Sequence, residues 1–238
     1  MRIGLFIVTL LITFCSFSQT TIIVRKEQDE IIAIADTRMS YVGSNKKDTV
    51  EKIGYENGIG FAVGGVFFAE NFKLPSECCK NAKTYDEAVD SFLAKGMFQV
   101  GEHYATLKQE YIDFYKRHMY QVASFAIFFS YENEKYKVTP ITFAIGTTIS
   151  SGKSVAGATI GTLGGACDLD TATFTFGFLN AIRDSVCLDA TWRPNPEETA
   201  IRLMRKQIND KESSEFVGAP ITLITIKKKK IVRRHIDE

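Results

Sequence analysis

After its first 20 residues, the chain has a hydrophobic pattern typical of a β-hairpin. Residues 21–24 and 31–35 are apolar and largely β-branched, and charged residues separate them, so two strands with a tip at 26–29 are predicted. The apolar positions that follow predict a short strand that carries Lys52 and another strand over 58–63. A pair of glycines then ends that strand, at a point where the backbone turns sharply or approaches another segment closely.

Two segments have the apolar period of an α-helix. Thr84 and Glu87 form a capping box, and the apolar residues that follow predict one long helix to about residue 114. Alternatively, two helices are broken near Gly96 or Gly101. The aromatic stripe of this segment is expected to pack in the core. A second helix is predicted over 195–209, with a proline in its first turn.

The remaining segments complete an order of strands, helices, strands, helices and strands, with no internal repeat. Residues 66–83 contain Pro75, so any helix there is expected to be interrupted. Paired strands are predicted over 122–130 and 136–145, followed by a Gly- and Ser-rich connection and a strand over 156–161. A helical segment within 169–187 and a final strand over 221–226 complete the chain. This order suits the α+β class, with two sheets packed face to face and helices outside.

Composition and charge favour one globular domain. The 238 residues are 45% hydrophobic and 24% charged, which suits a single sizeable core. A net charge of +1 argues against nucleic-acid binding, and the basic run 227–230 is expected in a solvated strand or turn.

The stretch 146–154 resembles a phosphate-binding loop, but five residues separate its glycines and no helix is predicted after it, so nucleotide binding is not predicted.

Residues 1–18 have the features of a secretory signal peptide. Arg2 precedes a short apolar run, and Ser16 and Ser18 stand at the −3 and −1 positions of a cleavage site before Gln19. The apolar run is too short for a comfortable transmembrane helix, and the competing interpretation is a buried first strand. We therefore expect an exported protein, periplasmic or secreted, with 19–238 as one domain and no stable membrane span after cleavage.

The cysteines and histidines do not predict a metal site. Removal of the signal peptide leaves Cys78, Cys79, Cys167 and Cys187, which allow three disulfide pairings that the sequence does not distinguish. The chain has no CxxC motif and its three histidines are scattered, so neither a metal nor another cofactor is expected.

Thr20, Asp36 and Lys52 form the most informative constellation. Asp36 follows Thr20 by 16 positions and Lys52 follows it by 32, and all three stand at or near predicted strands. These residue types at these intervals resemble the N-terminal segment of proteasome β-type subunits, which are N-terminal-nucleophile hydrolases. The resemblance implies a four-layer αββα sandwich over the whole domain. The Trp192-Arg193-Pro194 segment and the approach to the last strand add weaker similarity in the same order.

The resemblance also implies a role for each site residue. Thr20 would attack the substrate with its own α-amino group as base, because a free α-amine titrates near ~7.7–8.0. Lys52 would lower the pKa of the Thr20 hydroxyl, and Asp36 would keep Lys52 charged and oriented. The backbone N–H of Gly65 is the expected oxyanion donor. The resemblance further gives supporting roles to Arg38 and to Thr162, which would replace a serine of the family.

Several positions depart from the family pattern. Gln19 stands where a glycine is usual, and Ser214 and Val217 stand where an aspartate and a serine support the amine in active members.

The expected substrate is a peptide, but two alternatives stay open: a catalytically silent relative with a structural or binding role, and an amidase for a small acylated molecule. A homo-oligomer is a further expectation. The connection within 146–187 is longer than in the family, which suggests a lid or an assembly surface.

Overall fold

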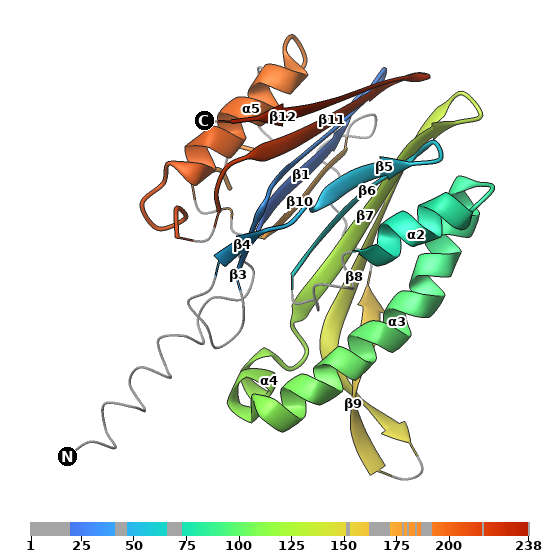
Figure 1. The fold of residues 1–238 in the computed structure, drawn as a ribbon, viewed down its shortest axis with the longest axis vertical. Coiled ribbons are helices and arrows are strands. Elements are labelled where there is room, and N and C mark those ends of the chain that lie inside the picture. Colours follow the sequence, from blue (N-terminus) through green and yellow to red (C-terminus); the bar gives the residue numbers. More distant parts are fainter. Residues whose placement is uncertain are drawn as a thin grey trace.

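The computed structural model describes residues 20–40, 47–65, 73–150, 153–161, 172–177, 179, 181–183, 185–186, 192–215 and 217–237. These residues form a mixed α and β structure of two five-stranded antiparallel sheets, one two-stranded sheet and four helices (Figure 1). The predicted signal peptide, Gln19, Thr162 and Cys167 and Cys187 lie outside the described residues.

The first sheet contains the predicted N-terminal hairpin. Its order is β10-β1-β2-β11-β12, and each neighbouring pair is antiparallel. The strands are β1 (Thr21–Lys26), β2 (Ile31–Asp36), β10 (Ala172–Gly177), β11 (Ile221–Lys227) and β12 (Lys230–Ile236). Ile22 pairs with Ala35 in the hairpin, so that prediction is confirmed.

Two predictions about this sheet are wrong. The helix predicted within 169–187 is contradicted at 172–177, which form β10, in which threonines alternate with Phe174 and Phe176. That alternation has the two-residue period of a strand, and it pairs with β1. The strand over 221–226 is not the last one either, because the basic turn after it leads into β12.

The second sheet has the order β5-β6-β7-β8-β9. Its strands are β5 (Ile53–Glu56), β6 (Ile59–Gly65), β7 (Val122–Glu132), β8 (Lys135–Ser150) and β9 (Lys153–Gly161). The paired strands predicted over 122–130 and 136–145 are confirmed. Lys52 itself precedes β5, so the prediction that a strand carries it is wrong.

The Gly- and Ser-rich connection after residue 145 is also strand. Gly146 pairs with Gly157 and Ser150 pairs with Lys153, so β8 and β9 form a long hairpin. β9, not a helix, therefore follows the stretch that resembles a phosphate-binding loop. The third sheet is small and consists of β3 (Arg38–Ser40) and β4 (Lys47–Thr49).

The helices are α2 (Leu74–Asn81), α3 (Tyr85–Glu110), α4 (Ile112–His118) and α5 (Pro196–Ile208). Pro75 lies in the first turn of α2, where it costs no helical hydrogen bond, so it starts this helix and does not interrupt it. The Thr84 side chain accepts a hydrogen bond from the N–H of Glu87 at 3.2 Å. α3 continues through both glycines, so the single long helix is confirmed to Glu110 and the alternative break near Gly96 or Gly101 is wrong. The helix ends at Glu110, and α4 begins after Tyr111.

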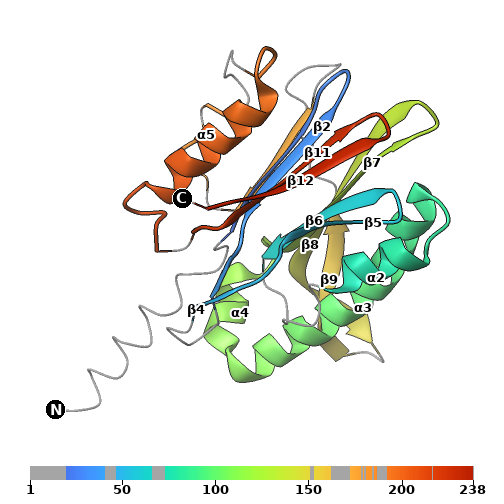
Figure 2. The ribbon, with the colours of Figure 1, turned by 45° about the horizontal axis from the view of Figure 1, so that its top comes forward.

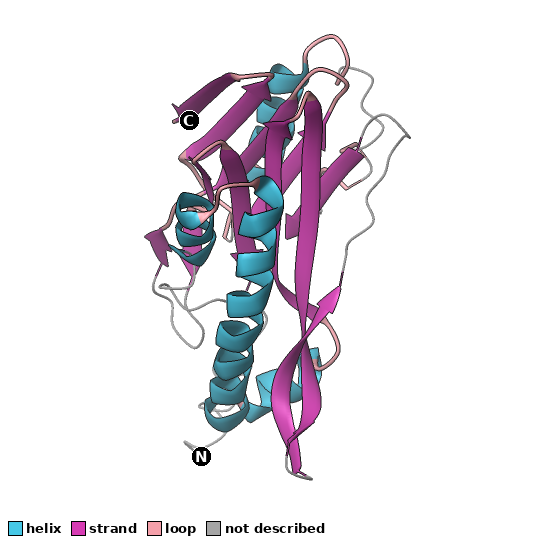
Figure 3. Ribbon diagram, turned by 90° about the vertical axis from the view of Figure 1, so that its right-hand side faces the viewer, coloured by secondary structure: helices cyan, strands magenta, loops and turns pink. Residues whose placement is uncertain are grey.

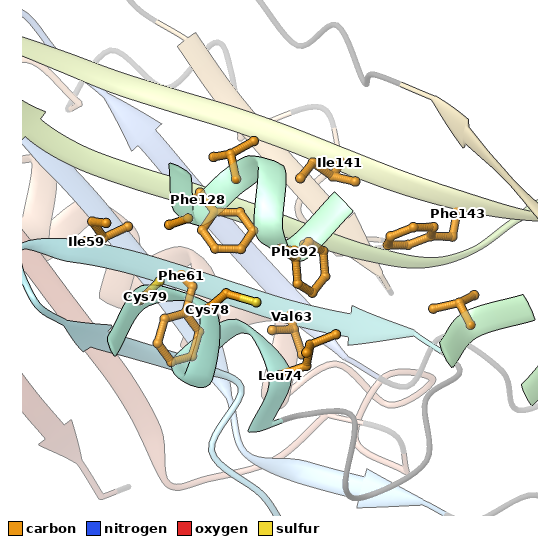
Figure 4. Close-up of a cluster of buried hydrophobic side chains, with 14 of the residues drawn as sticks. Ile59, Phe61, Val63, Leu74, Cys78, Cys79, Phe92, Phe128, Ile141 and Phe143 are labelled. Atoms are coloured by element: carbon orange, nitrogen blue, oxygen red, sulfur yellow. The ribbon is translucent and has the colours of Figure 1, made fainter. Parts of the chain in front are cut away.

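Three buried clusters hold these elements together. One contains inward-facing residues of both large sheets, among them Ile22, Ala33, Ile127 and Phe129. A second joins α2, α3 and Tyr115 of α4 to the other face of the second sheet (Figure 4). The third joins α5 to the first sheet. Figures 1 and 2 accordingly show α5 on one side of the paired sheets and α2 and α3 on the other.

The apolar stripe of α3 lies in the core for most of its length. Figure 3 shows this helix running along the second sheet. Phe92, Val100, Tyr104 and Leu107 are buried, whereas Met97 is 45% exposed and departs from the prediction. No helix among the described residues has both the length and the apolar character that a membrane crossing requires.

Candidate functional site

The N-terminal hairpin places Thr20 and Asp36 at the same end of the first sheet. Thr20 directly precedes β1, and Asp36 is the last residue of β2. The backbone N–H of Thr21 donates a hydrogen bond to Asp36 Oδ1 at 2.7 Å, which fixes the start of β1 against this carboxylate. Asp36 is fully buried and Thr20 is 5% exposed.

Lys52 reaches the same carboxylate from the second sheet. Its ammonium nitrogen lies 2.8 Å from Asp36 Oδ2 and also donates a hydrogen bond to the carbonyl oxygen of Arg38. The carbonyl of Lys52 accepts a bond from the N–H of Val63 at 2.7 Å, which ties this residue to β6. The two side chains are 2% and 0% exposed, so they form a buried ion pair between the end of β2 and the residue that precedes β5.

Burial changes the acid–base behaviour of this pair. Burial raises the pKa of Asp36, and the charge of Lys52 and the hydrogen bonds from Lys52, Thr21 and Arg38 oppose the rise. Burial likewise lowers the pKa of Lys52, and Asp36 opposes that fall. Asp36 thus offsets part of the desolvation that disfavours the Lys52 ammonium, an effect that sequence reasoning missed because burial is not visible in the sequence.

The glycine pair at the end of β6 lies next to Thr20. A β-carbon placed on Gly64 would lie 3.0 Å from Thr20 Cγ2, so the Thr20 methyl group packs directly against this backbone. N–H groups alternate sides along a strand, and Val63 directs its N–H to Lys52. Gly65, two residues later, therefore directs its N–H toward the same side. Its φ of +97° is in the left-handed region that favours glycine.

Arg38 connects the ion pair to the segment before β11. Its backbone N–H donates to Asp36 Oδ2 at 3.0 Å, and its guanidinium group donates to the carbonyl oxygen of Ser214. The guanidinium also lies so close to Gly218 that a β-carbon there would overlap it. Ser214 thus meets the site through its backbone, while Val217 is buried in the cluster beneath α5.

Gly177 is a residue of this site that sequence reasoning did not find. It ends β10, pairs with Thr21, and lies so close to Thr20 that a β-carbon would overlap the Thr20 carbonyl oxygen. The alternation of threonine and phenylalanine before Gly177 could have identified β10 from the sequence, but this segment is predicted to be helical instead. Gly161, which precedes Thr162, pairs with Thr142 in the other sheet.

The described residues hold no group of three or more His, Cys, Asp and Glu side chains arranged to bind a metal ion. Cys78 and Cys79 are buried free thiols of α2. Burial raises the pKa of both thiols, to about 12 for Cys79, so at neutral pH they stay protonated.

Comparisons with known proteins give structural similarity only. No protein-family model matches the chain, and no curated protein sequence matches it. Among solved structures, Anbu from Hyphomicrobium sp. strain MC1 and its Gly-1 mutant each have a TM-score of 0.48. The identities are 14% and 16%, and the alignments cover 91% of this chain and 87% of the other. Similarity at this level assigns neither a family nor an activity.

Proposed function

We propose that this chain is an exported N-terminal-threonine hydrolase with a proteasome-like, four-layer αββα fold, and that it cleaves amide bonds in peptides. The observation that carries this proposal is the buried Lys52–Asp36 pair, whose carboxylate accepts a hydrogen bond from the N–H of Thr21, next to Thr20. The glycine pair that ends β6 lies against Thr20 from the other sheet. Desolvating two charges is costly, and replacing such a pair with apolar residues is often neutral or stabilising. A chemical role is therefore a better explanation for this pair than stability.

The proposed reaction is an acyl transfer through Thr20. Once residue 19 is removed, the α-amino group of Thr20 accepts the proton of the hydroxyl while Oγ1 attacks the substrate carbonyl carbon. The proton then passes to the leaving amine as the C–N bond breaks, which leaves an ester on Thr20. Water hydrolyses the ester and restores the hydroxyl. The Lys52 ammonium favours the ionised oxygen, and the N–H of Gly65 stabilises the oxyanion.

Removal of residue 19 is part of the proposal. Signal peptidase would cut before Gln19, because Ser16 and Ser18 are small. Attack by Thr20 Oγ1 on the Gln19 carbonyl carbon would then break the Gln19–Thr20 C–N bond, which frees the α-amino group and leaves Gln19 as an ester on Oγ1. Water would hydrolyse this ester, releasing Gln19 and restoring the hydroxyl. We expect the mature wild-type protein to begin at Thr20 and a Thr20→Ala variant to retain Gln19, which intact-mass measurement and N-terminal sequencing report.

The test of the mechanism is a set of three substitutions assayed on a fluorogenic peptide panel. Lys52→Ala and Asp36→Ala are expected to abolish hydrolysis, because each removes one half of the buried pair. Lys26→Ala, at the far end of β1, is expected to leave it intact. Normal turnover by Lys52→Ala would refute the mechanism.

A second candidate function is a catalytically silent, proteasome-like protein with a binding role. The observation that favours it is the segment before β11, where Ser214 stands in place of the family's aspartate and meets Arg38 through its backbone carbonyl. Wild-type protein that keeps Gln19 and hydrolyses no peptide or small amide would favour this candidate. Turnover of small acylated amides alone would instead identify an amidase.

A further inference from the structure

Thr20 lies between two glycines that come from different sheets. Gly64 belongs to β6 of the second sheet, and Gly177 belongs to β10 of the first. A β-carbon on Gly64 would lie 3.0 Å from Thr20 Cγ2 and 2.6 Å from the ring of Phe125. A β-carbon on Gly177 would overlap the Thr20 carbonyl oxygen and lie 2.6 Å from its carbonyl carbon. A side chain on Gly177 has no room while Thr20 stays where it is. On Gly64 the nearer obstacle is the Phe125 ring, and the Thr20 methyl group would also have to give by a few tenths of an ångström.

The two contacts act on different parts of Thr20. Gly177 limits the position of its carbonyl group and hence of the peptide plane that leads into Thr21. Gly64 limits the position of its methyl group. The methyl and hydroxyl groups of a threonine share one β-carbon, so fixing the methyl group also fixes the direction of Oγ1.

We infer that Gly64 and Gly177 are positioning residues, which hold the Thr20 hydroxyl in the orientation that attack on a carbonyl requires. This inference rests on the proposed function. It adds two residues to the site, and neither acts through a side chain. The contribution is orientation of the nucleophile, for which a displacement of about 1 Å costs on the order of 100-fold in rate.

The chain contains a matched control for each glycine. Gly58 has a φ of +85°, comparable with the +100° of Gly177, but a β-carbon there would meet only Tyr55 Oη, at 3.8 Å. Gly58→Ala therefore carries the cost of a left-handed backbone without touching Thr20. A β-carbon on Gly60 would overlap the ring of Phe129, as one on Gly64 would crowd a ring, and Thr20 is not among its nearest atoms.

The experiment compares Gly64→Ala with Gly60→Ala and Gly177→Ala with Gly58→Ala. For each variant, kcat and KM are measured on a fluorogenic peptide, stability by thermal unfolding, and hydrogen exchange at the Thr21 amide. That amide donates to Asp36 Oδ1 at 2.7 Å, so its exchange rate reports the position of the residue before β1 without relying on turnover. We expect kcat of the Gly64 and Gly177 variants to fall by about 100-fold, with KM changed by less than about threefold. Their Thr21 amides should exchange faster than those of their controls.

The Gly58 and Gly60 variants are expected to lose stability but to keep kcat within about twofold of wild type. Equal kcat and equal Thr21 exchange in each matched pair would overturn the inference. If Gly177→Ala does not fold, the comparison of Gly64→Ala with Gly60→Ala decides alone. Wild-type protein without hydrolytic activity would refute the proposed function, and Thr21 exchange would still decide whether the glycines hold Thr20.

Discussion

Replacing Lys52 with methionine tests the electrostatics of the site through stability alone. The substitution keeps most of the side-chain volume and removes the charge that faces Asp36 at 2.8 Å. Asp36 then remains a buried carboxylate with hydrogen bonds from the N–H groups of Thr21 and Arg38. Breaking a buried pair by removing one partner costs about 3–5 kcal/mol. For a chain of this size that corresponds to a fall in Tm of roughly 6–20 °C.

The cost is expected to depend on pH in a defined direction. Burial raises the pKa of Asp36 above its ordinary value of 3.8, and Lys52 opposes the rise, so Lys52→Met raises the folded-state pKa further. A carboxyl whose pKa is raised by folding adds stability below its unfolded pKa, and that contribution is lost as the pH rises through its folded pKa. The loss caused by Lys52→Met should therefore be largest near about pH 7.5 and shrink toward about pH 5.

Urea unfolding followed by the fluorescence of Trp192, the single tryptophan, measures both effects. Trp192 is 1% exposed, so its emission changes when the cluster beneath α5 opens. Lys137→Met is the control, because Lys137 pairs with Glu132 and Asp86 but is 28% exposed, and its loss should cost about 1 kcal/mol or less. An additional Asp36→Asn change should recover part of the loss. The reasoning fails if Lys52→Met unfolds at the wild-type midpoint, or if its deficit is the same at both pH values.

Two further predictions concern groups far from the site. The thiols of Cys78 and Cys79 should resist alkylation at about pH 8 in the folded protein and react after unfolding, because burial keeps them protonated. Peptide mass spectrometry checks this, and rapid labelling of native Cys79 would contradict it. Tyr136→Phe should lower stability by about 1 kcal/mol, because the Tyr136 hydroxyl joins three hairpin tips by donating to the Asp29 carbonyl and accepting from the N–H of Lys228. Thermal unfolding measures this loss of stability. Tyr120→Phe is the control, because Tyr120 is 73% exposed and its substitution should not change the Tm.

Local patterns were enough for several elements of the fold. The first hairpin, α3 and α5 follow from apolar periods and capping residues that lie within a few positions of one another. Where two local signals conflicted, the prediction failed. β10 was expected to be helical although its threonines alternate with phenylalanines, and Pro75 was expected to interrupt the helix that it starts.

The candidate site likewise has some features that local sequence predicts and others that only the tertiary structure shows. The sequence by itself determined that Thr20 and Asp36 would lie together, because a hairpin returns the chain to its starting end, and the interval to Lys52 suggested a third member. Only the tertiary structure decided that Lys52 is buried, since desolvation depends on two sheets closing over it. Contacts of Thr20 with Gly177, and of Arg38 with the Ser214 carbonyl, join positions more than 150 residues apart. No local period encodes such contacts, because they depend on which strands pair and which faces pack.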